Sequence, residues 1–169
     1  MRIAVVPGSF DPMTLGHINI IERASRLFDK VFVAVMINDA KSYMFSPEER
    51  TAIARLSCEH LSNVEVIFDD GMLASLALRL DACAIVKGIR DEKDYHYEFE
   101  MAQYNYEKNP NALTVFLPCE EGARDISSTA VRVRLENGAD ISDMVSKNAI
   151  EFIKNTDKCG ACPTICEQA

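Results

Sequence analysis

The chain has 169 residues, of which 48% are hydrophobic and 26% charged, and its formal net charge is −8. This size and composition fit one globular domain with its own core and argue against a multidomain protein. The negative charge argues against a general binding surface for nucleic acid or anionic membrane, because either would require a positive field, so anionic ligands must be bound by local groups.

The amino-terminal residues 1–7 reach a turn after one short apolar run, which is too short for a signal peptide. No stretch approaches the 18 apolar residues of a membrane span. We therefore expect a cytoplasmic protein with no membrane partner.

Five short apolar runs rich in β-branched residues predict strands, and each gap between them is long enough for a helix. Continuous apolar strands indicate burial on both faces, as in a parallel sheet covered by helices. The expected fold is α/β, a doubly wound Rossmann-like parallel five-stranded sheet with helices on both faces. Its ligands should bind beyond the carboxyl ends of the strands. The runs are residues 3–6, 31–37, 64–68, 84–87 and 114–117.

Helix starts are marked by capping residues. Thr14 precedes a helical spacing of apolar residues, and Ser46-Pro47-Glu48-Glu49 forms a capping box with proline at the first helical position. Further helices are expected at residues 72–80, 94–108, 128–136 and 141–154. No linker divides the chain before about residue 156, so we predict a domain over residues 1–156 and a flexible tail over 157–169.

The segment after the first strand, residues 7–17, is rich in turn formers and leads into a helix start. Gly8 and Gly16 permit close backbone approach to a ligand, and the free N–H groups of a helix start attract phosphate. His17 could donate a hydrogen bond to a phosphoryl oxygen. Taken alone, a Gly-x-His sequence more often marks a structural histidine beside a loop.

The whole segment, however, resembles the signature of the nucleotidyltransferase superfamily, Gly-x-Phe-Asp-Pro followed by Thr/His-x-Gly-His. Neither the dinucleotide fingerprint Gly-x-Gly-x-x-Gly nor a P-loop occurs, which disfavours dehydrogenases and P-loop enzymes. The fixed positions are occupied by Gly8, Phe10, Asp11, Pro12, Thr14, Gly16 and His17.

Up to about residue 154 the chain is similar to the bacterial phosphopantetheine adenylyltransferases. Three further segments carry the resemblance, residues 41–50, residues 87–90 with 94–98, and residues 126–129. The resemblance implies transfer of the adenylyl group of ATP to 4′-phosphopantetheine, giving dephospho-coenzyme A and pyrophosphate without a covalent enzyme intermediate. Such a reaction needs positioning and positive charge, because the acceptor phosphate is already ionised.

The same resemblance implies roles for individual residues. His17 stabilises the pentacovalent phosphorus as the catalytic residue. Lys41, Leu73, Lys87 and Ser9 bind the acceptor, with Lys41 at its phosphate and Leu73 at the pantetheine arm. ATP is bound by Ser9, Phe10, His17, Gly88, Ile89, Arg90, Glu98, Ala123, Arg124, Asp125, Ile126, Ser127, Ser128 and Thr129.

The resemblance also implies Mg²⁺ held mostly by ATP phosphates and water, with no protein metal site. It further implies a homohexamer and coenzyme A as a feedback ligand.

Several interpretations stay open at this point. Lys41 could be a solvated loop lysine, Ser127 to Thr129 could serve only as a helix cap, and Glu98 could have a surface or interface role. The chain also departs from the family pattern. Lys87 replaces an arginine, exchanging a two-pronged fork for a point charge, and Ala123 and Asp125 replace aromatic residues.

Two other functions remain as alternatives. Related transferases act on nicotinate mononucleotide or glycerol phosphate, and Thr14 and Lys41 weigh against both. Only the departures at Lys87 and Asp125 favour a regulatory protein that binds nucleotide without catalysis. In the tail, Cys159, Cys162 and Cys166 are spaced for a soft metal or an iron–sulfur cluster, but a fourth ligand is not evident, and we expect reduced thiols instead.

Overall fold

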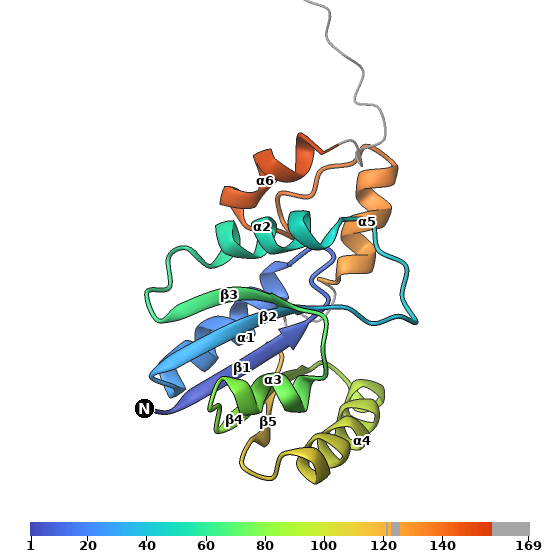
Figure 1. Cartoon of the computed structure of the whole chain (residues 1–169). Helices are drawn as coiled ribbons and strands as arrows, with labels where there is room; N and C mark the ends of the chain where they lie inside the picture. The colour runs from blue at the N-terminus through green and yellow to red at the C-terminus, as the bar shows by residue number, and fades with distance from the viewer. Residues whose placement is uncertain (121, 123–125, 157–169) are drawn as a thin grey trace, which may run out of the picture.

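The protein is described by a computed structural model that covers residues 1–120, 122 and 126–156. Its centre is a five-stranded sheet in the order β3-β2-β1-β4-β5, and all neighbouring strands are parallel (Figure 1). This confirms the predicted fold. The strands are β1 (Ile3–Gly8), β2 (Lys30–Met36), β3 (Val64–Asp69), β4 (Ala84–Ile89) and β5 (Leu113–Pro118).

Alternating residues of β1 to β4 enter two separate cores, as the period of two requires. Val6 and Val33 belong to the larger core, which also contains residues of α1 (Leu15–Leu27), α2 (Pro47–Cys58), α5 (Ser128–Glu136) and α6 (Lys147–Lys154). Val5 and Ala34 belong to the smaller core on the opposite face, against α3 (Leu73–Arg79). Both faces of β1 to β4 are therefore covered, which explains why these strands are mostly apolar.

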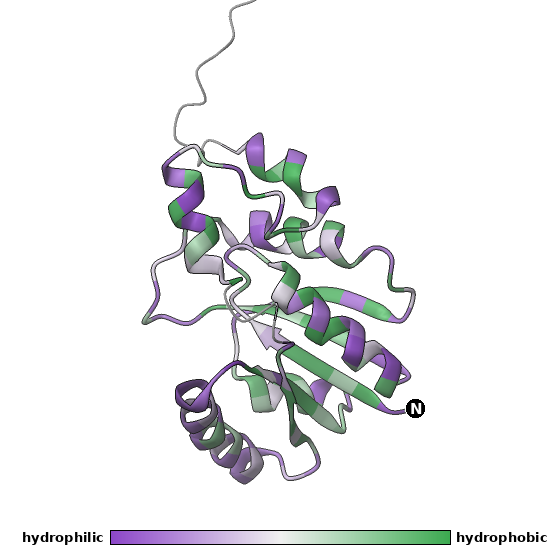
Figure 2. Cartoon of the chain, turned by 180° about the vertical axis from the view of Figure 1, so that it is seen from behind, coloured by the Kyte–Doolittle hydropathy of each residue, from purple (hydrophilic) through white to green (hydrophobic). Residues whose placement is uncertain are grey.

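The helix α4 (Glu92–Lys108) lies beside β4 and β5 at the end of the sheet and is weakly buried. Among its residues only Asn105 is buried, and Figure 2 shows α4 as mostly hydrophilic beside hydrophobic strands. No helix in the described part of the chain is both long and apolar enough to cross a membrane. Exposed aromatic and apolar side chains of α4 are Tyr95, Tyr97, Phe99, Met101, Tyr104 and Tyr106.

The predicted capping box opens α2. The Ser46 hydroxyl accepts a hydrogen bond from the Glu49 N–H at 3.2 Å, and the Glu49 carboxylate accepts one from the Ser46 N–H at 2.7 Å. The predicted helix over residues 141–154 was wrong in its first part. Ile141 and Met144 are buried by a turn closed by the Met144 N–H to the Ile141 carbonyl, and α6 begins only at Lys147. A turn can bury two residues that lie three positions apart, as a helix does. The spacing of Ile141 and Met144 therefore could not distinguish a turn from a helix.

The site follows from the strand order. The chain leaves β1 toward β2 on one side and later returns through β4 on the other side of β1. In open parallel sheets the crevice beyond the carboxyl ends of two such strands is where ligands bind. The loops after β1 and β4 therefore frame the candidate site.

Candidate active site

A cleft of about 640 Å³ lies at the carboxyl ends of β1 and β4, within the usual size range of small-molecule sites. It brings together nearly all predicted site residues that the structure describes. Ile89 is the exception, because it ends β4 without lining the cleft and its carbonyl accepts from the Cys119 N–H at 2.8 Å. Ala123, Arg124 and Asp125 lie outside the described residues, as does the tail 157–169. The cleft is lined by Ser9, Phe10, His17, Lys41, Leu73, Lys87, Gly88, Arg90, Glu98, Ile126, Ser127, Ser128 and Thr129.

The loop after β1 is folded tightly against itself. Phe10 has a φ of 47° and turns its buried ring back over Gly8, where a Cβ atom would lie 2.7 Å from the ring. A larger residue at position 8 would therefore force the Phe10 ring to shift. The same Phe10 ring contacts the His17 imidazole edge-on, with 5.2 Å between ring centroids, and so restricts its orientation.

The protonation of His17 is fixed by the helix start that carries it. Its Nδ1 accepts a hydrogen bond from the Thr14 N–H at 3.0 Å and lies 2.9 Å from the Thr14 hydroxyl. Burial, helped by the positive charge of Arg90, lowers the pKa of His17 to about 4. At neutral pH the imidazole is therefore uncharged and carries its proton on Nε2, where it can act as a hydrogen-bond donor.

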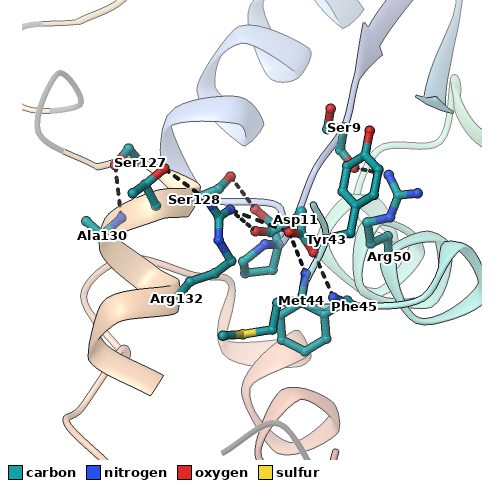
Figure 3. Close-up of polar contacts among 12 residues, drawn as sticks. Ser9, Asp11, Tyr43, Met44, Phe45, Arg50, Ser127, Ser128, Ala130 and Arg132 are labelled. Atoms are coloured by element: carbon teal, nitrogen blue, oxygen red, sulfur yellow. Dashed lines mark hydrogen bonds and ion pairs between the residues drawn. The ribbon is translucent and has the colours of Figure 1, made fainter. Parts of the chain in front are cut away.

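Asp11 joins this loop to two other segments (Figure 3). Its buried carboxylate accepts from the N–H groups of Met44 and Phe45, both at 2.9 Å, and lies 3.5 Å from the Arg132 guanidinium. Arg132 also donates to the Asp11 carbonyl at 2.7 Å. The carboxylate is thus used inside the protein, where it fixes the segment after β2 against the segment after β1.

The start of α5 is held against the same loop. The Ser127 hydroxyl accepts from the Ala130 N–H at 3.1 Å, and the Ser128 hydroxyl donates to the Pro12 carbonyl at 2.8 Å (Figure 3). The capping role is therefore real for Ser127, and all three predicted hydroxyls are used within the protein, because that of Thr129 accepts from Arg132. The first-turn N–H groups of Ser128 and Thr129 have no partner within the helix, as at any helix start, and remain suited to an anion.

Two cations that line the cleft near β4 are paired with acids of α4. The Lys87 ammonium lies 3.0 Å from the Glu98 carboxylate. Arg90 makes two hydrogen bonds to Asp94, at 2.7 and 3.1 Å, and these raise the pKa of the Arg90 guanidinium. An anionic ligand must therefore compete with protein carboxylates at this edge.

A second, smaller cavity of about 220 Å³ adjoins the cleft. Leu73 and Lys87 line both cavities, so the recess opens beside a cation. Its walls are formed mainly by large apolar and aromatic side chains. They are Met72, Leu73, Lys87, Tyr97, Met101, Tyr104 and Asn105.

Sequence reasoning assigned no role to three residues at or near the cleft, which are Arg132, Tyr43 and Arg50. Arg132 could have been found from its spacing, because it lies three and four residues after Thr129 and Ser128 on one helix face, and it donates to the Thr129 hydroxyl at 3.1 Å. Tyr43 lines the cleft and stacks on the buried Arg50, a contact that no local pattern signals. Among the described residues, no group of three or more His, Cys, Asp or Glu side chains is placed to hold a metal ion.

Comparison with known proteins agrees with this geometry. The cytidylyltransferase-like family matches residues 5–134, and fold and cleft together define a nucleotidyltransferase. A phosphopantetheine adenylyltransferase of Caldanaerobacter subterraneus is 43% identical over 160 residues, 92% of this chain and 100% of the relative. One from Actinobacillus pleuropneumoniae is 43% identical over 153 residues, 90% of this chain and 97% of the relative. The chain belongs to the phosphopantetheine adenylyltransferase family of enzymes.

The fold is also shared with a solved structure. A Vibrio parahaemolyticus protein, assigned provisionally as a nicotinate-nucleotide adenylyltransferase, superposes with a TM-score of 0.74 at 23% identity and covers 96% of this chain and 98% of its own. At this identity the likeness supports the sheet topology alone.

Proposed function

We propose that the enzyme transfers the adenylyl group of ATP to 4′-phosphopantetheine, with dephospho-coenzyme A and pyrophosphate as products. The observation that carries this proposal is the apolar recess that opens beside Lys87. An acceptor with a phosphate and a long, weakly polar arm fits a cation next to such a recess. Glycerol phosphate has no arm to fill it, and nicotinate mononucleotide would bring a charged ring to apolar walls.

The reaction requires no protein nucleophile. An oxygen of the ionised acceptor phosphate forms a bond to the α-phosphorus of ATP, while the bond from that phosphorus to the bridging oxygen breaks and pyrophosphate leaves with the electron pair. Negative charge crowds around the α-phosphorus as this happens. The neutral His17 can donate a hydrogen bond from its Nε2–H to a phosphoryl oxygen. As a neutral imidazole it does not give up this proton to the leaving pyrophosphate.

On the acceptor side, Lys41 and Lys87 supply positive charge. Lys41 is exposed at the lip of the cleft, and Lys87 lies where the cleft meets the recess. A lysine at position 87 attracts phosphate as a point charge but does not grip it in two places as an arginine would. Besides its expected contact with ATP, Glu98 on α4 then also restrains the ammonium group of Lys87.

On the ATP side, the donors come from β4 and α5. Arg90 follows β4, and the first-turn N–H groups of Ser128 and Thr129 open α5. Arg132 lines the same cleft one helical turn later and adds a positive charge. The polyphosphate of ATP would therefore meet a guanidinium and a helix start together.

Mg²⁺ fits this arrangement as a companion of ATP. Among the residues that the structure describes, three carboxylates line the cleft, those of Asp11, Asp94 and Glu98, and each already has a partner in the protein. We propose that the ion is held by ATP phosphates and water, and that it supplies charge neutralisation of the leaving pyrophosphate.

Assembly, regulation and location are proposed on chemical grounds. The exposed aromatic face of α4 supports self-association, and we propose the homohexamer implied by the family resemblance. Coenzyme A combines a pantetheine arm with an adenosine nucleotide, so it could occupy recess and cleft together as a feedback ligand. We propose the cytoplasm as its location, because ATP is available there.

The deciding experiment measures pyrophosphate release by the purified protein with ATP and Mg²⁺. Parallel reactions contain 4′-phosphopantetheine, nicotinate mononucleotide, or glycerol phosphate with CTP. Release with 4′-phosphopantetheine alone, together with dephospho-coenzyme A, is the expected result. Release only with another acceptor would refute the proposed substrate, and ATP binding without any release would instead identify a nucleotide-binding protein that lacks catalysis.

A further inference from the structure

A fully buried arginine lies behind the loop that carries Lys41. Arg50, in the first turns of α2, is 0% exposed. Its Nη1 donates to the Ser9 carbonyl at 2.6 Å (Figure 3). The same Nη1 donates to the Met36 carbonyl at 3.0 Å. Met36 ends β2 and Ser9 follows β1, so one guanidinium ties the ends of two neighbouring strands at the edge where the cleft lies.

This burial is costly for the protein. In the described part of the chain, Nε and Nη2 of Arg50 are buried with no hydrogen-bond partner. Buried charges with incomplete partners destabilise a fold, and apolar residues of similar volume often serve a core position better. A purely structural role therefore explains Arg50 poorly, whereas a role in holding the site explains why the cost is tolerated.

The guanidinium supports Tyr43, which in turn closes the loop. The Tyr43 ring lies over Arg50 at 4.2 Å from its central carbon. The Tyr43 hydroxyl accepts from the Asn38 N–H at 2.6 Å and lies 3.1 Å from the Asn38 carbonyl, to which it donates. The Lys41 N–H donates to the same carbonyl at 2.9 Å. Lys41 thus sits within a small loop whose two ends are joined by the tyrosine.

We propose that Tyr43 and Arg50 are positioning residues that act on the acceptor phosphate through Lys41. The Lys41 side chain is exposed, so its ammonium can be directed only by fixing the backbone that carries it. The stack of Tyr43 on Arg50 and the hydrogen bond of the neighbouring Met44 N–H to Asp11 both fix the C-terminal end of this loop. The Tyr43 hydroxyl then ties Asn38, at the start of the loop, to that fixed end. The inference rests on the proposed function, because Lys41 matters only if a phosphate acceptor is bound near it.

The test compares Tyr43→Phe with and without Lys41→Ala, in the full chain with ATP, Mg²⁺ and 4′-phosphopantetheine. Tyr43→Phe keeps the ring on Arg50 and removes only the hydroxyl contacts. We expect kcat/KM for the acceptor to fall about 5- to 10-fold, the scale of one net hydrogen bond, with ATP affinity within about twofold of wild type. In the Lys41→Ala background the same change should cause no further loss.

Arg50→Lys provides a second line of evidence. It keeps the positive charge but loses the planar stack and the bridge between two carbonyls. We expect a larger loss in kcat/KM than for Tyr43→Phe. Only part of this loss should disappear in the Lys41→Ala background, because the contact of Arg50 with the Ser9 carbonyl does not act through Lys41. Ile53→Val is the matched control, since it removes a buried methylene from the same helix and should leave kcat/KM unchanged.

The outcomes separate the two proposals. A wild-type enzyme that transfers to no acceptor would refute the proposed function and the inference with it. An active enzyme that depends on Lys41 but not on Tyr43, or that loses equally from Tyr43→Phe in both backgrounds, would overturn the inference and leave the proposed function standing.

Discussion

The loop after β1 and the cations near β4 face the same cleft, yet their polar groups are satisfied in opposite ways. In the β1 loop, Asp11 is bound by backbone N–H groups and His17 is uncharged. Near β4, Lys87 and Arg90 are charged and paired with carboxylates of α4 that a ligand can displace. One region is therefore ready before ligand arrives, and the other has to exchange partners. Substitutions in the first should always cost activity or stability, whereas removing acids from the second should favour binding.

The largest effect is expected at His17. His17→Ala removes a preorganised donor to the transition state and should lower turnover by about 10²- to 10³-fold with ATP affinity little changed. Steady-state kinetics and ATP titration measure the two quantities separately. His60→Ala is the matched control, because His60 is a surface histidine paired with Glu22. Turnover that survives His17→Ala would exclude the assigned role.

The lowered pKa of His17 should also appear in the pH dependence of stability. Below pH 6.5 the unfolded chain binds a proton at this histidine, whereas the folded protein does so only near pH 4. The free energy of unfolding should therefore fall by about 3 kcal/mol in total as pH decreases from 6.5 to 4. Above pH 6.5 this loss should be absent.

Denaturant unfolding of wild type and His17→Asn across this range measures the effect as a difference. The variant should lack the loss attributable to His17, while carboxylates that titrate in the same range cancel between the two proteins. An NMR titration of the folded wild type should show no transition of the His17 imidazole centred at pH 6.5. A transition there would mean that the folded protein does not hold this imidazole neutral, whereas turnover cannot decide the point because the acceptor phosphate itself titrates near about pH 6.

Asp11→Asn should break the junction between the two loops. The amide has the same shape, but it places an N–H₂ group where an oxygen now accepts from Met44 or Phe45. We expect a loss of about 2 kcal/mol in the free energy of unfolding, because a buried donor is left without an acceptor. Asp29→Asn on the surface should change stability by less than about 0.5 kcal/mol. Equal stability of both variants would show that the β1 loop is not fixed by this carboxylate.

How much could be predicted from the sequence differs between fold and site. The five strands were predictable because each leaves a short run of mostly apolar residues, which is a local signal, and burial on both faces makes this run longest in the central strands. The start of α2 was predictable because Ser46 and Glu49 bond within one turn. Residues 141–146 were not, since a turn and a helix bury the same spacing there.

The residues that line the cleft were predictable through the signature segments, but their contacts were not. Asp11 is 33 residues from Met44 along the chain and 121 from Arg132, and no local pattern relates them. Arg50 was missed because a cation in a helix normally faces solvent, and here tertiary contacts at Ser9 and Met36 bury it. The predicted roles of His17, Lys41 and Lys87 in binding remain predictions.

The smallest effect, and the one that distinguishes the two regions by its sign, is expected at the acids of α4. Asp94→Asn frees the Arg90 guanidinium from its two hydrogen bonds. Because the pair is partly exposed, its net strength is modest, and ATP affinity should rise about two- to fivefold at low salt. Glu98→Gln should act similarly on the acceptor through Lys87.

Calorimetric titration at low and high salt can measure these changes, with Glu92→Gln as the control. Glu92 is an exposed acid of the same helix that faces His96, so its loss changes the net charge equally without touching Arg90. An increase in ATP affinity for Asp94→Asn beyond that of Glu92→Gln isolates the pairing. Weaker binding instead would mean that Asp94 holds Arg90 in the geometry that ATP needs, and both sides of the cleft would then be preorganised.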